Sequence, residues 1–225
     1  DQYALFTSYG AVENAATSGI IGNIGTNNGG ITGFSTSTHI GFVKIPGEET
    51  ALAKLELDSA YAQLMAIENT ELGHAATFGS GETVFPGVYF IGGAGSLSGT
   101  ITLDAQNNPN AIFVFKFGAA FSVAEQSKVI FKDGTRRCNV FWIAEGAIAV
   151  AAGSDVKGTL LSHQGAVSLA ANCNIEGRLL ATEGAITVGA GNTATAPMGP
   201  ISIPTSCSAN CTPASAVNVL GSVGD

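Results

Sequence analysis

Small and hydrophobic residues alternate in a pattern that recurs every 19 residues toward the C-terminal end of the chain. Three five-residue units share it: residues 146–150 (GAIAV), 165–169 (GAVSL) and 184–188 (GAITV). Alternation with a period of two predicts short β-strands with one buried side. A fixed short repeat predicts that these strands stack as the coils of a solenoid.

Residues at equivalent places in successive coils form columns, and the large apolar columns are expected to lie inside. The 19-residue spacing predicts three of them: Phe141 with Leu160 and Leu179, Trp142 with Leu161 and Leu180, and Val156 with Ile175. Residues 114–129 fit the same columns at an offset of 27, which adds an eight-residue insertion at 131–138. Residues 5–22 match 160–177 at an offset of 155 without a gap. Both ends of the chain are therefore predicted to form the same kind of coil.

Breaks at Gly, Asn and small residues predict about three short strands per coil and a roughly triangular section. We therefore predict a mainly β fold, a right-handed parallel β-helix. Its coils should stack about 4.8 Å apart, so that any column pointing outward forms a regular array. Residues 1–200 are expected to form this single domain, and residues 201–225, rich in Ser, Thr, Pro and Ala, a C-terminal tail.

Residues 49–69 contain Ala, Leu and Glu but no Gly or Pro, which predicts the one long helix of the chain. A broad apolar stripe is expected on it, formed by Leu52, Leu55, Leu57, Tyr61, Ala62, Leu64 and Met65. About 19 helical residues span roughly 28 Å, close to six coils, which predicts a helix packed along the solenoid axis over one face. Acidic residues on this helix oppose binding to an anionic membrane.

Two further stretches complete the organisation of the chain. The Gly- and Asn-rich residues 26–38 are expected to form a loop or a cap at one end of the solenoid. Residues 79–103 alternate like strands, and their expected core residues are Val88, Phe90, Leu97, Ile101 and Leu103.

Composition agrees with a solenoid and disfavours several partners. The chain has 225 residues, of which 45% are hydrophobic and 30 are glycine. Its 17 acidic and nine basic residues give a net charge of −8, which disfavours nucleic acid or an anionic membrane as a partner. No apolar run approaches the roughly 20 residues that span a bilayer. A start at Asp1 without an apolar leader is consistent with a removed signal peptide, so we predict a secreted protein.

Four cysteines divide into two groups. Cys207 and Cys211 lie in the tail at a spacing that a small disulfide loop can close, and we predict that bond. A metal site is the competing interpretation, although no histidine lies nearby in sequence. Cys138 and Cys173 fall on different columns and are predicted to be separate thiols.

A β-helix with a long helix inserted between its N-terminal coil and the remaining coils resembles the microbial ice-binding (antifreeze) proteins with a discontinuous β-solenoid. The similarity extends over about residues 3–197, and six segments carry it: 3–7 (YALFT), 20–25 (IIGNIG), 86–89 (PGVY), 139–142 (NVFW), 176–181 (EGRLLA) and 192–197 (NTATAP). The resemblance implies adsorption to an ice crystal surface through a flat solenoid face, inhibition of ice growth and recrystallisation, and no cofactor.

Some members of that family carry Thr-Ala/Gly-any-Thr/Asn on each coil, and four tetrads match in position: 16–19 (ATSG), 152–155 (AGSD), 171–174 (ANCN) and 190–193 (AGNT). Each begins with Ala instead of Thr. Two neighbouring columns of small residues are Ala15, Ala124, Ala151, Ala170 and Gly189, and Ser122, Ala149, Ser168 and Thr187. The predicted ice-binding residues are Ala16, Thr17, Ala152, Ser154, Ser168, Ala171, Asn172, Asn174, Thr187, Ala190, Asn192 and Thr193. The alternative role of these small residues is to allow tight corners or packing of the helix.

Parallel β-helices also carry polysaccharide lyases and hydrolases, so a polysaccharide-active enzyme is the main alternative. Glu145 and Glu183 share one column two coils apart, or about 9.6 Å, near the range for an inverting glycosidase pair. No Arg, His or further acid joins that column, and we predict a monomer without enzymatic activity. A surface adhesin or matrix protein is the third possibility.

Overall fold

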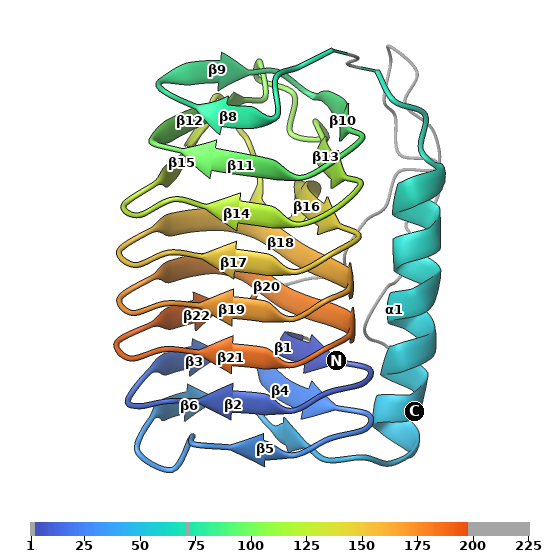
Figure 1. Ribbon diagram of the computed structural model, residues 1–225, viewed down its shortest axis with the longest axis vertical. Helices are drawn as coiled ribbons and strands as arrows, with labels where there is room; N and C mark the ends of the chain where they lie inside the picture. Colours follow the sequence, from blue (N-terminus) through green and yellow to red (C-terminus); the bar gives the residue numbers. More distant parts are fainter. Residues whose placement is uncertain (1–2, 71–72, 198–225) are drawn as a thin grey trace.

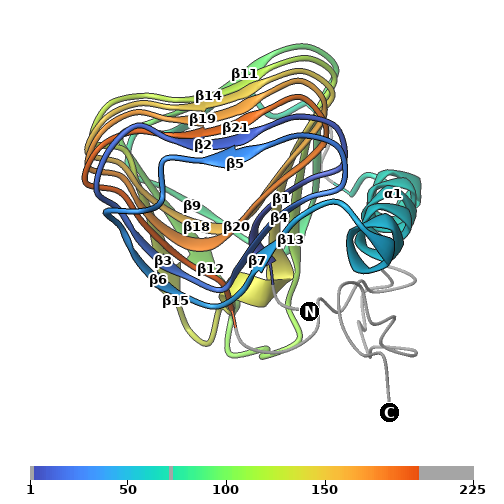
Figure 2. The same ribbon diagram turned by 90° about the horizontal axis from the view of Figure 1, so that it is seen from below.

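The protein is a parallel β-helix in the computed structural model, which describes residues 3–70 and 73–197. Short strands wind into stacked coils (Figure 1), and the view along the axis shows a triangular cross-section with one helix beside it (Figure 2). The strands form three faces, which we call faces A, B and C. The mainly β solenoid predicted from the repeat is confirmed.

Each face is a ladder of parallel strands that follow one another along the axis. Face A contains β10 (Gly87–Ile91), β13 (Phe113–Phe117), β16 (Val140–Ala144), the second halves of β18 (Asp155–Gln164) and β20 (Asn174–Glu183), β1 (Tyr3–Thr7), β4 (Asn23–Thr26) and β7 (Val43–Lys44). Face B contains β8 (Thr77–Gly79), β11 (Gly95–Ser98), β14 (Phe121–Val123), β17 (Ile148–Val150), β19 (Val167–Leu169), β21 (Ile186–Val188), β2 (Val12–Asn14) and β5 (Ile31–Thr32). Face C contains β9 (Glu82–Val84), β12 (Thr100–Asp104), β15 (Lys128–Lys132), the first halves of β18 and β20, β22 (Thr193–Thr195), β3 (Gly19–Ile21) and β6 (Thr38–Ile40). The insertion between β15 and β16 contains a short 3₁₀ helix, Arg137–Asn139.

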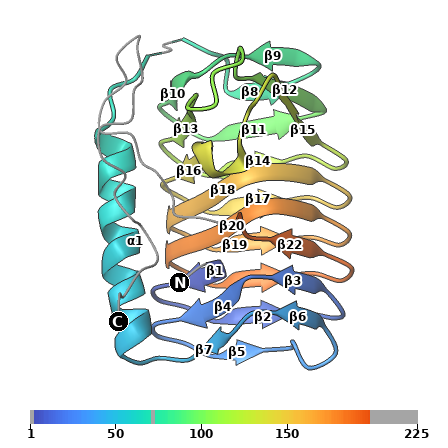
Figure 3. The ribbon, with the colours of Figure 1, turned by 180° about the vertical axis from the view of Figure 1, so that it is seen from behind.

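The N-terminal coil stacks directly on the last C-terminal coil. Leu5 pairs with Leu179 on face A, and Val12 pairs with Ile186 on face B. Residues 5–22 match residues 160–177 in sequence, and in the structure they stack on the next coil along the chain. Residues 26–38 do lie at the end of the solenoid, as expected, but they form part of a further coil through β5 and β6 (Figure 3).

Most predicted columns are confirmed, including Val156 with Ile175 and Leu160 with Leu179. Two columns were wrong by one residue at their first member, because Phe141 pairs with Thr159 and not with Leu160, and Trp142 pairs with Leu160 and not with Leu161. The reason lies in the corners between faces A and B. Residues 145–147 make the corner after β16, and the equivalent corner in the next coil, residues 163–166, is one residue longer. Paired residues of these two coils are therefore 18 positions apart on face A and 19 positions apart on face B.

Helix α1 (Glu48–Ala66) lies along face A over several coils, as predicted (Figure 3). Its buried side is the narrow stripe Thr50, Ala53, Leu57, Ala60 and Leu64, which alternates steps of three and four residues. The broad stripe predicted from the sequence was therefore partly wrong, since Leu52 and Leu55 are 51% and 62% exposed and Ala62 is exposed too. Large outward side chains of face A, such as Phe6 and Phe141, fill the gap beneath the helix, so that its small residues face them.

A second core fills the solenoid itself. Aromatic rings stack inside its upper coils, with 4.1 Å between the ring centroids of Phe115 and Trp142 and 4.4 Å between those of Phe117 and Phe121. Four of the core residues predicted within residues 79–103 are buried: Val88, Leu97, Ile101 and Leu103. Phe90 is 38% exposed, and this prediction was wrong because Phe90 points to the outer side of β10.

Candidate functional site

Face B presents three parallel columns of small side chains, one of them along the middle of its strands. The alternation of the strands sets this arrangement, since Ile148 and Val150 point inward and are buried while Ala149 between them is exposed. The middle column is Thr77, Ser96, Ser122, Ala149, Ser168, Thr187, Glu13 and Thr32. On one side of it lie Ala94, Ala120, Ala147, Ala166, Ala185 and Ala11, and on the other Ser98, Ala124, Ala151, Ala170, Gly189 and Ala15.

Backbone hydrogen bonds hold these columns in register from coil to coil. Ile148 N donates to Ala166 O at 2.9 Å, and Ala170 N donates to Val150 O at 2.8 Å. The strands of face B run side by side along one straight side of the cross-section (Figure 2). The two columns named from the sequence are confirmed in their register. The alanine column was missed, although its signal is the Ala that follows Gly in every repeat unit.

The other two faces differ from face B in cover or in charge. Helix α1 covers face A. Face C carries ion pairs, among them Lys157 with Glu176 at 2.8 Å and Lys132 with Asp104 at 2.7 Å between nitrogen and oxygen. In the three columns of face B, the single charged side chain is Glu13. Face B is thus the uncovered face with the fewest charges.

The third residue of each tetrad points inward at the corner between faces B and C, which corrects two predicted site residues. Ser154 is buried, and its hydroxyl donates to the carbonyl oxygens of Ala124 and Ala151, both at 2.9 Å. Asn192 is buried, and its Oδ1 accepts a hydrogen bond from Cys173 N at 2.6 Å. These side chains stabilise the corner from inside, so Ser154 and Asn192 cannot contact a surface.

The remaining predicted residues fall on three adjoining surfaces. Ser168 and Thr187 lie in the middle of face B. The corner beside face B carries the tetrad alanines and the tip residues after them: Ala16, Ala152, Ala171, Ala190, Thr17 and Asn172. Asn172 takes a left-handed backbone conformation there, with φ of 58°, which asparagine tolerates better than most residues. Asn174 and Thr193 lie around the corner on face C, where Thr193 Oγ1 donates to Asn174 Oδ1 at 2.5 Å.

Comparison with known protein families matches residues 6–194 to the family described as ice-binding-like. The chain belongs to the ice-binding-like family. An ice-binding protein of Nostoc sp. (strain HG1) is 29% identical over 153 residues, which cover 67% of this chain and 56% of the relative. A crystal structure of an ice-binding protein from an Antarctic bacterium, Flavobacteriaceae, has a TM-score of 0.84 and 38% identity over 88% of this chain and 46% of that one. The chain thus spans about half the length of these two relatives.

A fungal structure extends the comparison. The ice-binding protein of the Antarctic ascomycete Antarctomyces psychrotrophicus has a TM-score of 0.82 and 26% identity, over 88% of this chain and 96% of that one. Solved structures of lower identity share the fold. Membership of the ice-binding-like family confirms the resemblance drawn from the sequence.

In this member of the ice-binding-like family, Glu145 is hydrogen-bonded at the corner between faces A and B. The prediction that no histidine joins its column was wrong, because His163 lies beside it. Its carboxylate accepts hydrogen bonds from the Tyr61 hydroxyl and from His163 Nδ1, the latter at 3.0 Å. Partial burial opposes ionisation of Glu145, but the two hydrogen bonds and the charge of His163 outweigh it and lower the pKa of this carboxyl. Glu183 lies exposed, and its side chain has no partner among the described residues.

The two cysteines among the described residues, Cys138 and Cys173, lie outside the three columns of face B. Cys138 and Cys173 are separate free thiols, as predicted, and burial raises the pKa of the Cys173 thiol. Cys207 and Cys211 lie outside the described residues, so their disulfide remains a prediction that mass spectrometry of unreduced protein can test. Within residues 3–70 and 73–197, no group of His, Cys, Asp or Glu is arranged to hold a metal ion. None of the helices described there is long and apolar enough to cross a membrane.

Proposed function

We propose that this protein adsorbs to ice through face B and thereby inhibits the growth and recrystallisation of ice crystals, without chemical turnover. The single observation that carries the proposal is the three-column array of Ala, Ser, Thr and Gly on the one face that is neither covered by the helix nor crossed by ion pairs. Family membership and relatives named as ice-binding proteins support it.

The geometry of the array suits a crystalline target. Coils repeat about every 4.8 Å along the axis, and neighbouring columns are separated by two residues of a strand, or about 6.6 Å. Methyl groups hold water weakly, while the hydroxyls of Ser168 and Thr187 can join a hydrogen-bonded water lattice. Because backbone hydrogen bonds already fix the strands, binding orders little of the protein, and many weak contacts can add up.

A bulky residue in the middle of face B tests the proposal. Tyr at Thr187 or Ser168 would hold the neighbouring columns away from the ice surface, and we expect thermal hysteresis and recrystallisation inhibition to fall sharply, with at least a roughly tenfold loss of affinity. The matched control is Thr102→Tyr, which changes a half-buried Thr on face C. Equal activity of all three variants at unchanged thermal stability would refute the assignment of face B.

The proposal also covers the setting in which the protein acts. We propose that the protein is secreted, on the basis of the disulfide predicted between Cys207 and Cys211, and that it acts as a monomer. Detection in culture medium tests secretion, and sedimentation equilibrium tests the oligomeric state. The alternative of a surface adhesin predicts attachment of the protein to another solid surface with no shaping of a single ice crystal held just below its melting point.

A further inference from the structure

We infer that Glu13 marks the end of the ice-binding area nearest β5 and keeps the coil that contains β2 out of contact with ice; this inference rests on the proposed function. Glu13 occupies the middle column of face B, directly between Thr187 and Thr32. Its side chain is exposed. The described positions above it in that column are Ser, Thr or Ala.

The backbone around Glu13 continues face B without interruption. Val12 is buried and pairs with Ile186, and Ile186 N donates to Ala11 O at 2.9 Å. On the other side of Glu13, Ala15 N donates to Val188 O at 2.8 Å. Ala11 and Ala15 therefore continue the two flanking columns. Strand β2 has the shape of the strands above it and differs from them at the surface by this one side chain.

The coil that follows β2, which contains β5, does not carry all three columns. Strand β5 comprises only Ile31 and Thr32, and the chain then turns at Gly33, with φ of 82°, under the backbone of Asn14. The half-buried Phe34 packs against the core instead of continuing face B. Strand β2 is thus the last strand with all three columns, and the side chain at position 13 decides whether its coil can contact ice.

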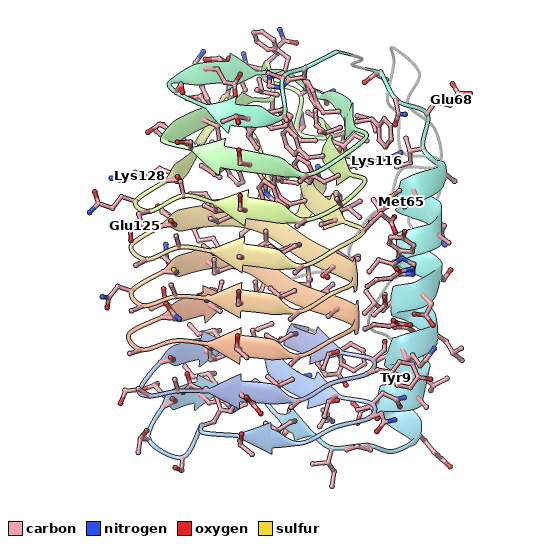
Figure 4. The ribbon with its side chains drawn as sticks, in the orientation of Figure 1. Tyr9, Met65, Glu68, Lys116, Glu125 and Lys128 are labelled. Carbon is pink, nitrogen blue, oxygen red and sulfur yellow. The ribbon has the colours of Figure 1, made fainter. Side chains whose placement is uncertain are left out.

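A carboxylate at this place opposes ice contact because an ionised group gives up its hydration shell only at a high cost. No ion pair or hydrogen bond compensates Glu13 within the described residues. Other charges near face B do not have this effect. Glu125 and Lys128 project from the corner, beside the face and away from its strands (Figure 4).

Substitution of Glu13 by Thr tests the inference, because Thr is the residue of the two neighbouring positions in the column. We expect Glu13→Thr to bind ice roughly two- to fivefold more tightly and to raise thermal hysteresis at equal concentration. Glu13→Lys should behave like the wild type, since it replaces one charge by another. The matched control is Glu68→Thr, which removes an exposed carboxylate beyond the far end of α1 (Figure 4).

The outcomes separate this inference from the proposed function. An increase with Glu13→Thr and none with Glu68→Thr supports the limit set by Glu13. Wild-type or lower activity of Glu13→Thr, with the fold intact by circular dichroism and Thr187→Tyr inactive, overturns the inference and leaves face B as the ice-binding face. If Thr187→Tyr is active as well, the proposed function of face B fails.

Discussion

The ring of Tyr61 stacks on the imidazole of His163, with 4.0 Å between the ring centroids. Tyr61 belongs to α1 and His163 to β18, and both side chains are hydrogen-bonded to Glu145 at the corner between faces A and B. We call these three residues the Tyr61–Glu145–His163 cluster. It joins the helix to the solenoid outside the apolar contact, and it lies apart from the three columns of face B.

The first prediction concerns the stability that this cluster contributes. Glu145→Gln keeps the size of the side chain but replaces the carboxylate that accepts both hydrogen bonds with a neutral amide. The free energy of unfolding should therefore fall by roughly 1 kcal/mol. Urea denaturation measures the change. Ice shaping should remain, because Glu145 lies outside face B.

Glu183→Gln is the matched control, since Glu183 is exposed and should leave stability unchanged. The double variant Glu145→Gln, Glu183→Gln also tests the enzyme alternative. A glycan-cleaving activity that the wild type shows and the double variant loses would contradict the non-enzymatic function.

The second prediction concerns the pH dependence of the same contact. Hydrogen bonds from Tyr61 and His163 lower the pKa of Glu145 in spite of its partial burial. A carboxyl with a lowered folded-state pKa contributes stability that is fully present above its unfolded-state pKa, about 4.3, and is lost as the pH falls through the folded-state value. The difference in Tm between the wild type and Glu145→Gln should therefore be largest near neutral pH and shrink below about pH 4. A difference that stays constant down to about pH 2 would contradict this cause.

The third prediction concerns the C-terminal end of α1. Lys116 on β13 is buried, and its Nζ donates to the carbonyl oxygens of Met65 and Ile67 at 3.0 and 2.5 Å (Figure 4). A cation at this end also interacts favourably with the helix dipole. Lys116→Met would leave buried carbonyl groups without this donor, so we expect a loss of about 1–3 kcal/mol in the free energy of unfolding.

An exposed lysine provides the comparison for Lys116. Lys128→Met on face C should change stability little, because solvent surrounds that side chain. Thermal and urea unfolding of both variants measure the contrast. Equal stability of the two would show that Lys116 does not anchor the helix.

The fourth prediction separates the corner from face C. Ala171 lies at the corner beside face B, whereas Asn174 lies around it on face C. Ala171→Tyr should place a ring at the edge of the array and lower ice affinity, while Asn174→Tyr should have a much smaller effect. Thermal hysteresis at matched concentration compares them. If Asn174→Tyr is as harmful as Ala171→Tyr, ice contact extends around the corner onto face C.

Much of the fold could be predicted from the sequence because its information is local and repeated. The 19-residue spacing places Val156 over Ile175 whatever the rest of the chain does, since every coil must bury the same side of its strands. The absence of Gly and Pro from residues 49–69 is local information too, and it predicted α1 (Glu48–Ala66). The repeat also aligns the small residues of face B in columns, although it does not give the direction in which their side chains point.

Only the tertiary structure decided which side of each element is used. In the sequence, Leu52 and Leu55 fit an apolar stripe as well as Ala53 and Leu57 do. In the structure, Ala53 and Leu57 are the buried residues, because the aromatic side chains of face A fill the space under that side of the helix. The inward turn of Ser154 depends on the carbonyl groups that the stacked corners bring within its reach. A repeat determines which residues share a column, but the direction of a column depends on contacts between coils and with the helix, which are distant in sequence.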